Sequence, residues 1–122
     1  MKTLSIFCAM ILSASSAFAA DVPAEAKNAS DKLVTALVNS DYDAFVADGD
    51  AAFKGLKKEM FDSVCKQLSA RFKSGYEVTW LGELKQTGYA VSLWKFTFKD
   101  GGDDMLGTLS LKDGKVGGFW IK

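Results

Sequence analysis

The stretch Leu68–Trp80, LSARFKSGYEVTW, contains the point at which the chain changes its hydrophobic period. Up to Phe72 the apolar residues recur every three or four positions, which is typical of an amphipathic helix. After Gly75 they alternate with polar residues, which is typical of a half-buried strand. Gly75 suits the end of a helix because glycine adopts left-handed backbone angles at little cost. The sequence therefore predicts helices before this point and strands after it.

Two longer segments on the N-terminal side show the helical period. Residues 23–39 place apolar side chains at three- and four-residue steps, and residues 56–72 form the clearest apolar stripe in the chain. A shorter helix capped by Ser40-Asp41 fits between them. We therefore expect helices over about residues 23–74.

The C-terminal half is divided into four predicted strands, over about residues 76–121, by three turn signals. In the second strand the apolar residues change parity near Leu93-Trp94. This change indicates either that both faces of the strand are covered or that one residue is inserted, and we expect a β-bulge there. The turns lie at Gln86-Thr87-Gly88, Asp100–Asp103 and Asp113-Gly114.

The last of these turns, Asp113-Gly114, is a strong two-residue hairpin signal and predicts a register for the final two strands. In that register Leu109 lies opposite Gly118, and Trp120 lies over the bare backbone of Gly107. The opposite face of the sheet then carries more apolar side chains than a solvated face should, so we interpret it as a surface for pairing with a second copy. Its residues are Leu81, Leu106, Phe119 and Ile121.

The first 19 residues have the three parts of a secretory signal peptide: a cationic start, an apolar stretch too short to span a membrane, and a small-residue site. Cleavage is expected after Ala19, which leaves residues 20–122 as one domain in the periplasm or outside the cell. Cleavage also removes Cys8. We expect the remaining Cys65 to be buried as a small hydrophobe, with an intermolecular disulfide as the main alternative.

Composition excludes several functions. The chain has no histidine, so Ser-His-Asp triads and HExxH zinc sites are absent. Its 15 basic and 15 acidic side chains are interspersed, so no nucleic-acid interface is predicted. The acidic groups within residues 41–50 and 100–104 suit helix caps and a turn and match no calcium loop. We expect no metal, no cofactor and no membrane span after signal removal.

Helices followed by a four-stranded antiparallel meander define an α+β fold. The segments Ser40–Phe45, Leu68–Gly75 and Asp113–Phe119, in this order, resemble the cystatin-like, cone-shaped roll of the nuclear-transport-factor-two-like superfamily. Within it they are similar to small secreted bacterial domains of unknown function. The resemblance implies N-terminal helices packed on a curved four-stranded sheet.

The superfamily that the chain resembles includes isomerases, dehydratases and non-catalytic binding modules. Its catalytic members mostly use an Asp-His pair or an Asp with a Tyr, and the first is impossible without histidine. A cofactor-free isomerase or lyase, using a carboxylate with Tyr76 or Tyr89, is therefore the alternative function. A second alternative is an inhibitor of an envelope enzyme, acting through the turns at 86–88 and 100–104.

Aromatic side chains of the strands carry the leading functional prediction. Part of the set is expected to fill the core, and part to line a pocket between helix and sheet. With no catalytic set, we predict non-catalytic binding of a small apolar molecule or an envelope protein. The pocket candidates are Tyr76, Trp80, Tyr89, Trp94, Phe96 and Trp120.

Overall fold

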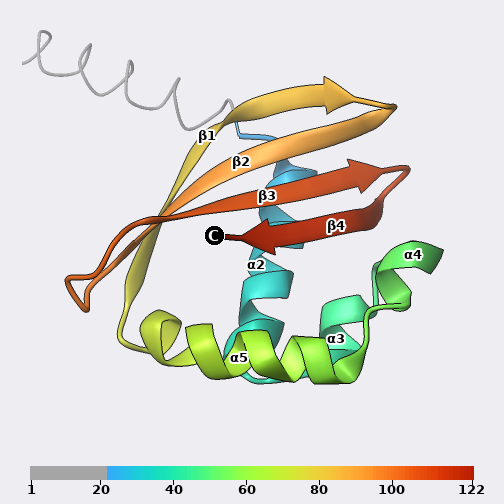
Figure 1. Cartoon of the computed structure of the whole chain (residues 1–122). Coiled ribbons are helices and arrows are strands. Elements are labelled where there is room, and N and C mark those ends of the chain that lie inside the picture. Colours follow the sequence, from blue (N-terminus) through green and yellow to red (C-terminus); the bar gives the residue numbers. More distant parts are fainter. Residues whose placement is uncertain (1–21) are drawn as a thin grey trace, which may run out of the picture.

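The computed structural model describes residues 22–122, so the predicted signal peptide and its cleavage site at Ala19 lie outside the described residues. Helices come first and strands second, which confirms the α+β fold class (Figure 1). The four strands form one open antiparallel sheet in the order β1-β2-β3-β4. The elements are α2 (Ala24–Val38), α3 (Tyr42–Val46), α4 (Ala51–Lys54), α5 (Lys58–Lys73), β1 (Tyr76–Gln86), β2 (Tyr89–Phe98), β3 (Met105–Lys112) and β4 (Lys115–Ile121).

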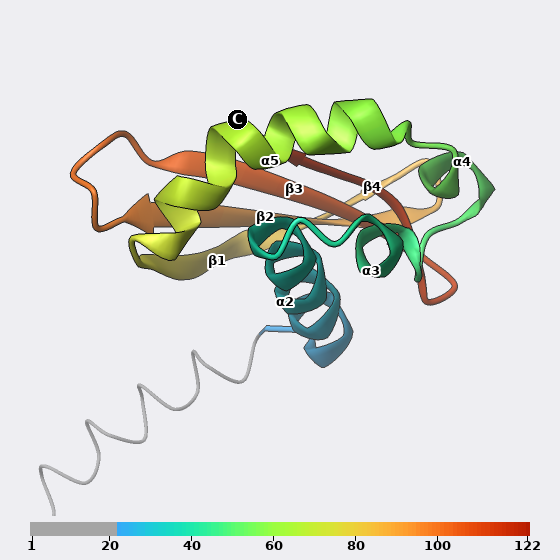
Figure 2. The same cartoon turned by 90° about the horizontal axis from the view of Figure 1, so that it is seen from below.

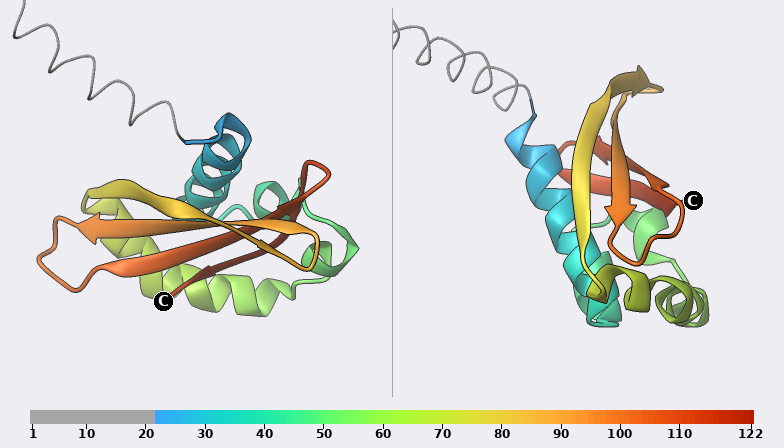
Figure 3. Two further views of the ribbon diagram at one scale, coloured as in Figure 1. Left: turned by 90° about the horizontal axis from the view of Figure 1, so that it is seen from above. Right: turned by 90° about the vertical axis from the view of Figure 1, so that its left-hand side faces the viewer.

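The two long helices, α2 and α5, lie on the same side of the curved sheet (Figure 2). Seen from above, no described helix covers the other side (Figure 3). We call the uncovered side the outer face. The core therefore forms between one face of the sheet and the apolar stripes of the two helices.

Phe72, near the end of α5, is at the centre of the packing between helix and sheet. Its ring makes edge-on contacts with Phe96 and Phe98 of β2, with centroids 5.4 and 5.0 Å away. The other buried side chains of α5 are Phe61, Cys65 and Leu68. The stripe predicted over residues 56–72 thus packs onto the sheet, and the prediction that Cys65 is buried is confirmed.

The β-bulge predicted near Leu93-Trp94 is on the neighbouring strand instead. Trp80 pairs with Trp94 and Gly82 pairs with Leu93, so Leu81 of β1 is the extra residue. Strand β2 itself is regular, and its even-numbered residues from Trp94 onward face the helices. The prediction of a bulge in β2 is wrong because this strand carries apolar side chains on both faces.

The register predicted for the last hairpin is correct at the turn and wrong beyond it. Leu111 pairs with Val116 as expected, but a bulge follows and Gly117 becomes an extra residue of β4. Phe119 therefore lies opposite Leu109, and Trp120 no longer pairs with Gly107. Because successive side chains of a strand point to opposite faces, this slip of one residue exchanges the faces of the end of β4.

The bulge has two causes, and both involve residues that are distant in the sequence. Gly117 has no side chain, and a Cβ atom there would lie 2.4 Å from Cε2 of Tyr89, so the ring occupies the space that a regular residue would need. The preceding residue, Val116, is also held by the chain before α4. Its N–H donates to the Asp48 carbonyl and its carbonyl accepts from the Asp50 N–H, each at 2.9 Å.

Candidate functional site

A groove with a volume of about 590 Å³ lies between α5 and the last strand, β4. One wall consists of the start of α5 and the link before it, and the other consists of residues 117–121 of β4. Every described residue that lines it is apolar or a glycine, except Lys57. The lining residues are Leu37, Phe45, Ala52, Phe53, Gly55, Leu56, Lys57, Met60, Phe61, Val64, Gly117, Gly118, Phe119, Trp120 and Ile121.

The groove exists because α5 presents a wider apolar surface than the sheet covers. Phe61 and Cys65 of this helix are buried in the core. Met60 and Val64, each one position earlier on the helix, are 59% and 41% exposed. Trp120 of β4 also lines the groove and is 58% exposed, but its ring lies over Gly118, on the other face of the strand from Phe119 and Ile121. Large exposed apolar side chains that cluster in this way are typical of binding surfaces.

Aromatic rings form the floor of the groove at the end near α4. Phe45 of α3 lies at the centre, with ring centroids 5.4 Å from Phe53, 4.9 Å from Phe61 and 6.3 Å from Phe119. The link between α4 and α5 is held by Tyr42, whose hydroxyl donates to the Leu56 carbonyl. The floor is thus built from packed aromatic rings that come from α3, α4, α5 and β4.

The predicted pocket residues do not come together around one cavity. Trp94 and Phe96 are buried in the filled core, 3% and 0% exposed. Tyr76 packs against Phe72, and Trp80 is half-buried at the edge of the sheet. Tyr89 extends over Gly117. Only Trp120 of the six candidates lines the groove.

The residues predicted to form a dimer face are also divided between the two faces of the sheet. Leu81 is the bulge residue and is 53% exposed, and Leu106 lies opposite Lys95 on the outer face. Phe119 and Ile121 are instead on the side of the helices and line the groove. The bulge at Gly117 causes this change of face.

Sequence reasoning missed the helical half of the groove. Met60 and Val64 belong to the predicted stripe of α5, but a stripe alone does not show which of its residues remain uncovered. A signal was present in the width of that stripe, which exceeds what one sheet face can bury. The position of β4 relative to α5 depends on contacts between distant parts of the chain.

The carboxylate and tyrosine required by an isomerase are not in the groove. Among the described residues that line it there is no Asp, Glu or Tyr. The Tyr89 hydroxyl is 3.4 Å from Asp50, which caps α4 through a bond from the Phe53 N–H. Burial raises the pKa of Tyr76. Within residues 22–122, no three Cys, Asp or Glu side chains are grouped in a way that could hold a metal ion.

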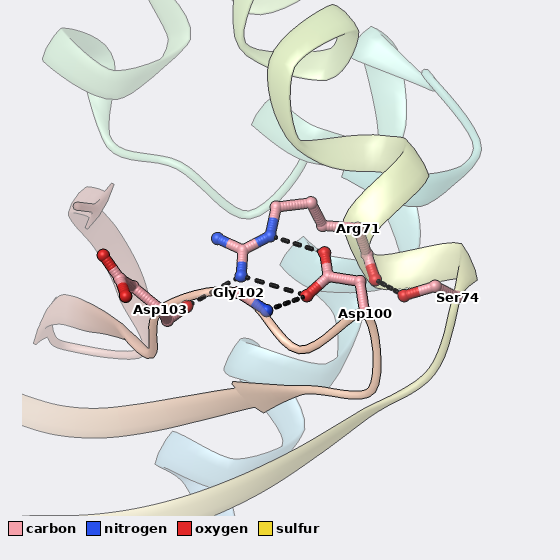
Figure 4. A network of polar contacts seen from close by, with 5 residues as sticks. All are labelled: Arg71, Ser74, Asp100, Gly102 and Asp103. Atoms are coloured by element: carbon pink, nitrogen blue, oxygen red, sulfur yellow. Dashed lines mark hydrogen bonds and ion pairs between the residues drawn. The ribbon is translucent and has the colours of Figure 1, made fainter.

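The turn between β2 and β3 is tied to the end of α5 by Arg71 (Figure 4). Its guanidinium donates to both Asp100 oxygens, from Nε at 2.8 Å and from Nη2 at 3.3 Å, and to the Asp103 carbonyl at 2.7 Å. The same guanidinium stacks 4.1 Å above the ring of Phe98. The hydrogen bond from Arg71 lowers the pKa of the Asp100 carboxyl. The turn is therefore a braced structural element.

Comparisons with known proteins give no further assignment. No protein-family model matches the chain, and no curated protein matches it. None of the described helices is long and apolar enough to cross a bilayer. Function must therefore be argued from the groove itself.

Proposed function

We propose that this protein is a non-catalytic, exported binding domain that holds an apolar ligand in the groove between α5 and β4. The observation that carries the proposal is the lining of the groove: apart from Lys57, only apolar residues and glycines contribute. A ligand that covered Met60 and Val64 would remove their exposed apolar surface from water. Burial of such surface contributes about 25 cal/mol per Å².

The chemistry of the groove favours binding over the isomerase alternative. Proton abstraction requires a base within hydrogen-bonding reach of the substrate. Lys57 is the only titratable residue among the described lining residues, and it is exposed on the link before α5. Tyr76 and Tyr89, the two tyrosines considered for an oxyanion hole, both lie outside the groove.

Export and superfamily membership are part of the same proposal. The order of elements and the curved sheet support the resemblance to the nuclear-transport-factor-two-like superfamily. Export is tested by expressing the full chain in a Gram-negative host and determining the N-terminus of the periplasmic product. We expect cleavage after Ala19. An uncleaved chain retained in the cytoplasm would contradict export.

Self-association through the outer face is supported by two exposed leucines of β1. Leu81 and Leu84 are 53% and 46% exposed, and Leu106 lies on the same sheet. Pairing of two outer faces would cover these side chains. Sedimentation velocity is expected to show a dimer that Leu84→Lys converts to a monomer. A monomer at every concentration would contradict this part of the proposal.

The binding function is tested with N-phenyl-1-naphthylamine, a neutral apolar probe whose fluorescence increases in apolar surroundings. We expect saturable binding that Val64→Lys weakens at least about tenfold, equivalent to 1.4 kcal/mol. Val78→Lys is the matched control, because Val78 is exposed to the same degree but lies on β1, outside the groove. Equal affinity for both variants would exclude the groove as the binding site.

A further inference from the structure

The free edge of β4 bears unpaired main-chain groups directly beside the groove. Leu106 and Lys122 exchange both possible hydrogen bonds, at 2.7 and 3.0 Å. In an antiparallel pair such exchanges occur at every second residue, so Trp120 and Gly118 also bond to β3. The N–H and C=O groups of Phe119 and Ile121 therefore point away from β3.

The same edge already accepts main-chain pairing at its other end. Val116 bonds to the chain at Asp48 and Asp50, in a parallel bridge opposite Gly49. This pairing ends before the groove begins. Along Phe119 and Ile121, no described backbone group takes its place.

The two edges of the sheet differ in their protection against pairing. The β1 edge carries charged residues and the bulge at Leu81, and both features discourage addition of a strand. Residues 117–121 of β4, Gly-Gly-Phe-Trp-Ile, have neither a charge nor a proline. Beyond Gly117 their register with β3 is regular. This edge therefore lacks the usual protection where it borders an apolar groove.

An extended peptide fits an apolar groove beside unpaired main-chain groups better than a compact apolar molecule does. An added strand lies about 4.8 Å from its neighbour and directs alternate side chains to the same face. Its main chain would pair with Phe119 and Ile121. Its side chains on the helix side would contact Met60 and Val64. Addition of an extended peptide to a sheet edge is an established mode of recognition, in which the main chain gives affinity and the side chains give specificity.

Charge determines which peptide fits. Lys57 lines the groove, Lys54 lies in the last turn of the adjacent α4, and Lys122 follows the free edge. No described lining residue is acidic. The basic ends of the groove are complementary to carboxylates that flank an apolar segment.

The same charges disfavour a second copy in this position. An antiparallel pair that placed Phe119 opposite Ile121 of another copy would bring the second Lys122 opposite Gly118. That is the end of the groove where α4 and Lys57 lie. Lys57 of one copy and Lys122 of the other would then approach each other at each end of the interface.

We propose that the natural ligand is an extended, apolar peptide segment with acidic flanks, which adds to the free edge of β4 as a fifth strand. The proposal rests on the assignment of the groove as the binding site and specifies the class of ligand. Side chains at every second position of the peptide occupy the space between β4 and α5. Carboxylates of the peptide lie toward Lys57 and Lys122.

The experiment is selection of a displayed library of random heptapeptides against the intact protein. We expect enriched peptides to alternate apolar and polar residues and to carry Asp or Glu at the ends. Lys57→Glu should weaken binding of the enriched peptide about three- to tenfold, whereas Lys66→Glu, on the part of α5 outside the groove, should not. N-methylation of the peptide amides that pair with β4 should abolish binding.

Amide exchange measured by NMR tests the geometry itself. The enriched peptide should slow exchange at Phe119 and Ile121. Gly118 and Trp120, already bonded to β3, should change little. Failure to enrich any peptide, enrichment of basic or helical peptides, or unchanged exchange at Phe119 and Ile121 would overturn the proposal.

The outcomes separate this proposal from the proposed function. Binding of N-phenyl-1-naphthylamine without peptide binding would retain the apolar groove and reject strand addition. Loss of both would reject both. A third outcome is protection of Phe119 and Ile121 in the free protein that disappears on dilution. That result would identify a second copy as the occupant and would also overturn the proposal.

Discussion

Trp80 and Trp94 lie directly opposite each other on β1 and β2, yet only Trp94 has an acceptor for its indole N–H. Trp94 Nε1 donates to Ser92 Oγ at 3.0 Å. Trp80 Nε1 is buried and, among the described residues, has no partner. A buried donor without an acceptor costs about 1–3 kcal/mol relative to its hydrated state. The two indoles therefore contribute differently to stability.

Replacing each tryptophan with phenylalanine tests this difference. We expect Trp80→Phe to change the free energy of unfolding by less than about 1 kcal/mol, because the lost apolar contact is offset by removal of an unpaired donor. Trp94→Phe is expected to cost about 2–4 kcal/mol, because it leaves a cavity and removes the hydrogen bond to Ser92. Urea unfolding measures both values. Equal losses would show that the Trp80 N–H finds an acceptor in solution.

Gly117→Ala tests the cause of the bulge that redirects β4. An added Cβ would lie 2.4 Å from Tyr89 Cε2, so the ring must move. We expect a loss of about 1–3 kcal/mol in the free energy of unfolding, typical of overpacking. The double variant with Tyr89→Leu should lose less than the sum of the single variants, by about 1 kcal/mol. Additive losses would show that the ring does not set the register.

This bulge also marks the limit of what the sequence predicts. The change of period at Gly75 and the turn at Asp113-Gly114 are local signals, and the predicted elements follow them. The register beyond Leu111 depends on Tyr89, which is distant in the sequence, and on the chain before α4. No local pattern contains that information.

The groove was missed for the same physical reason. Its aromatic floor comes from Phe45, Phe53 and Phe61. The sequence pattern places Phe45 and Phe61 on helices and Phe53 in the link between them. Their contact with Phe119 depends on the face to which the end of β4 turns. The pattern predicts that Phe45 and Phe61 are apolar and helical, but tertiary packing decides whether the space above the three rings is filled.

Stability should depend on pH through the bond between Arg71 and Asp100. Arg71 and the Gly102 N–H hold the pKa of Asp100 below its usual value, about 3.9 in unfolded chains. A carboxyl group whose pKa is lower in the folded state than in the unfolded chain stabilises the folded protein. This contribution is complete at pH values above the pKa of the unfolded chain. The contribution is lost as the pH falls through the pKa that Asp100 has in the folded state.

Asp100→Asn isolates this contribution. We expect the variant to be less stable than the wild type at pH 7, and the difference to shrink below about pH 4, as Asp100 of the wild type becomes protonated. Urea unfolding at pH 7 and pH 2.5 measures it. Asp43→Asn is the control, because the Asp43 side chain is exposed and lies in a different part of the fold. A difference that is the same at both pH values would show that the charge of Asp100 does not contribute.

Cys65 should react only when the protein unfolds. Its side chain is 4% exposed, and burial raises the pKa of its thiol, so both access and the thiolate fraction are low. At pH 8 we expect 5,5′-dithiobis(2-nitrobenzoate) to label the native protein slowly, at a rate that rises with urea in step with unfolding. Rapid labelling of the native protein, or a disulfide-linked dimer under oxidising conditions without denaturant, would contradict burial and favour the intermolecular bridge. Cys65→Ala should cost about 1 kcal/mol, because the sulfur fills space in the core with the other buried side chains of α5.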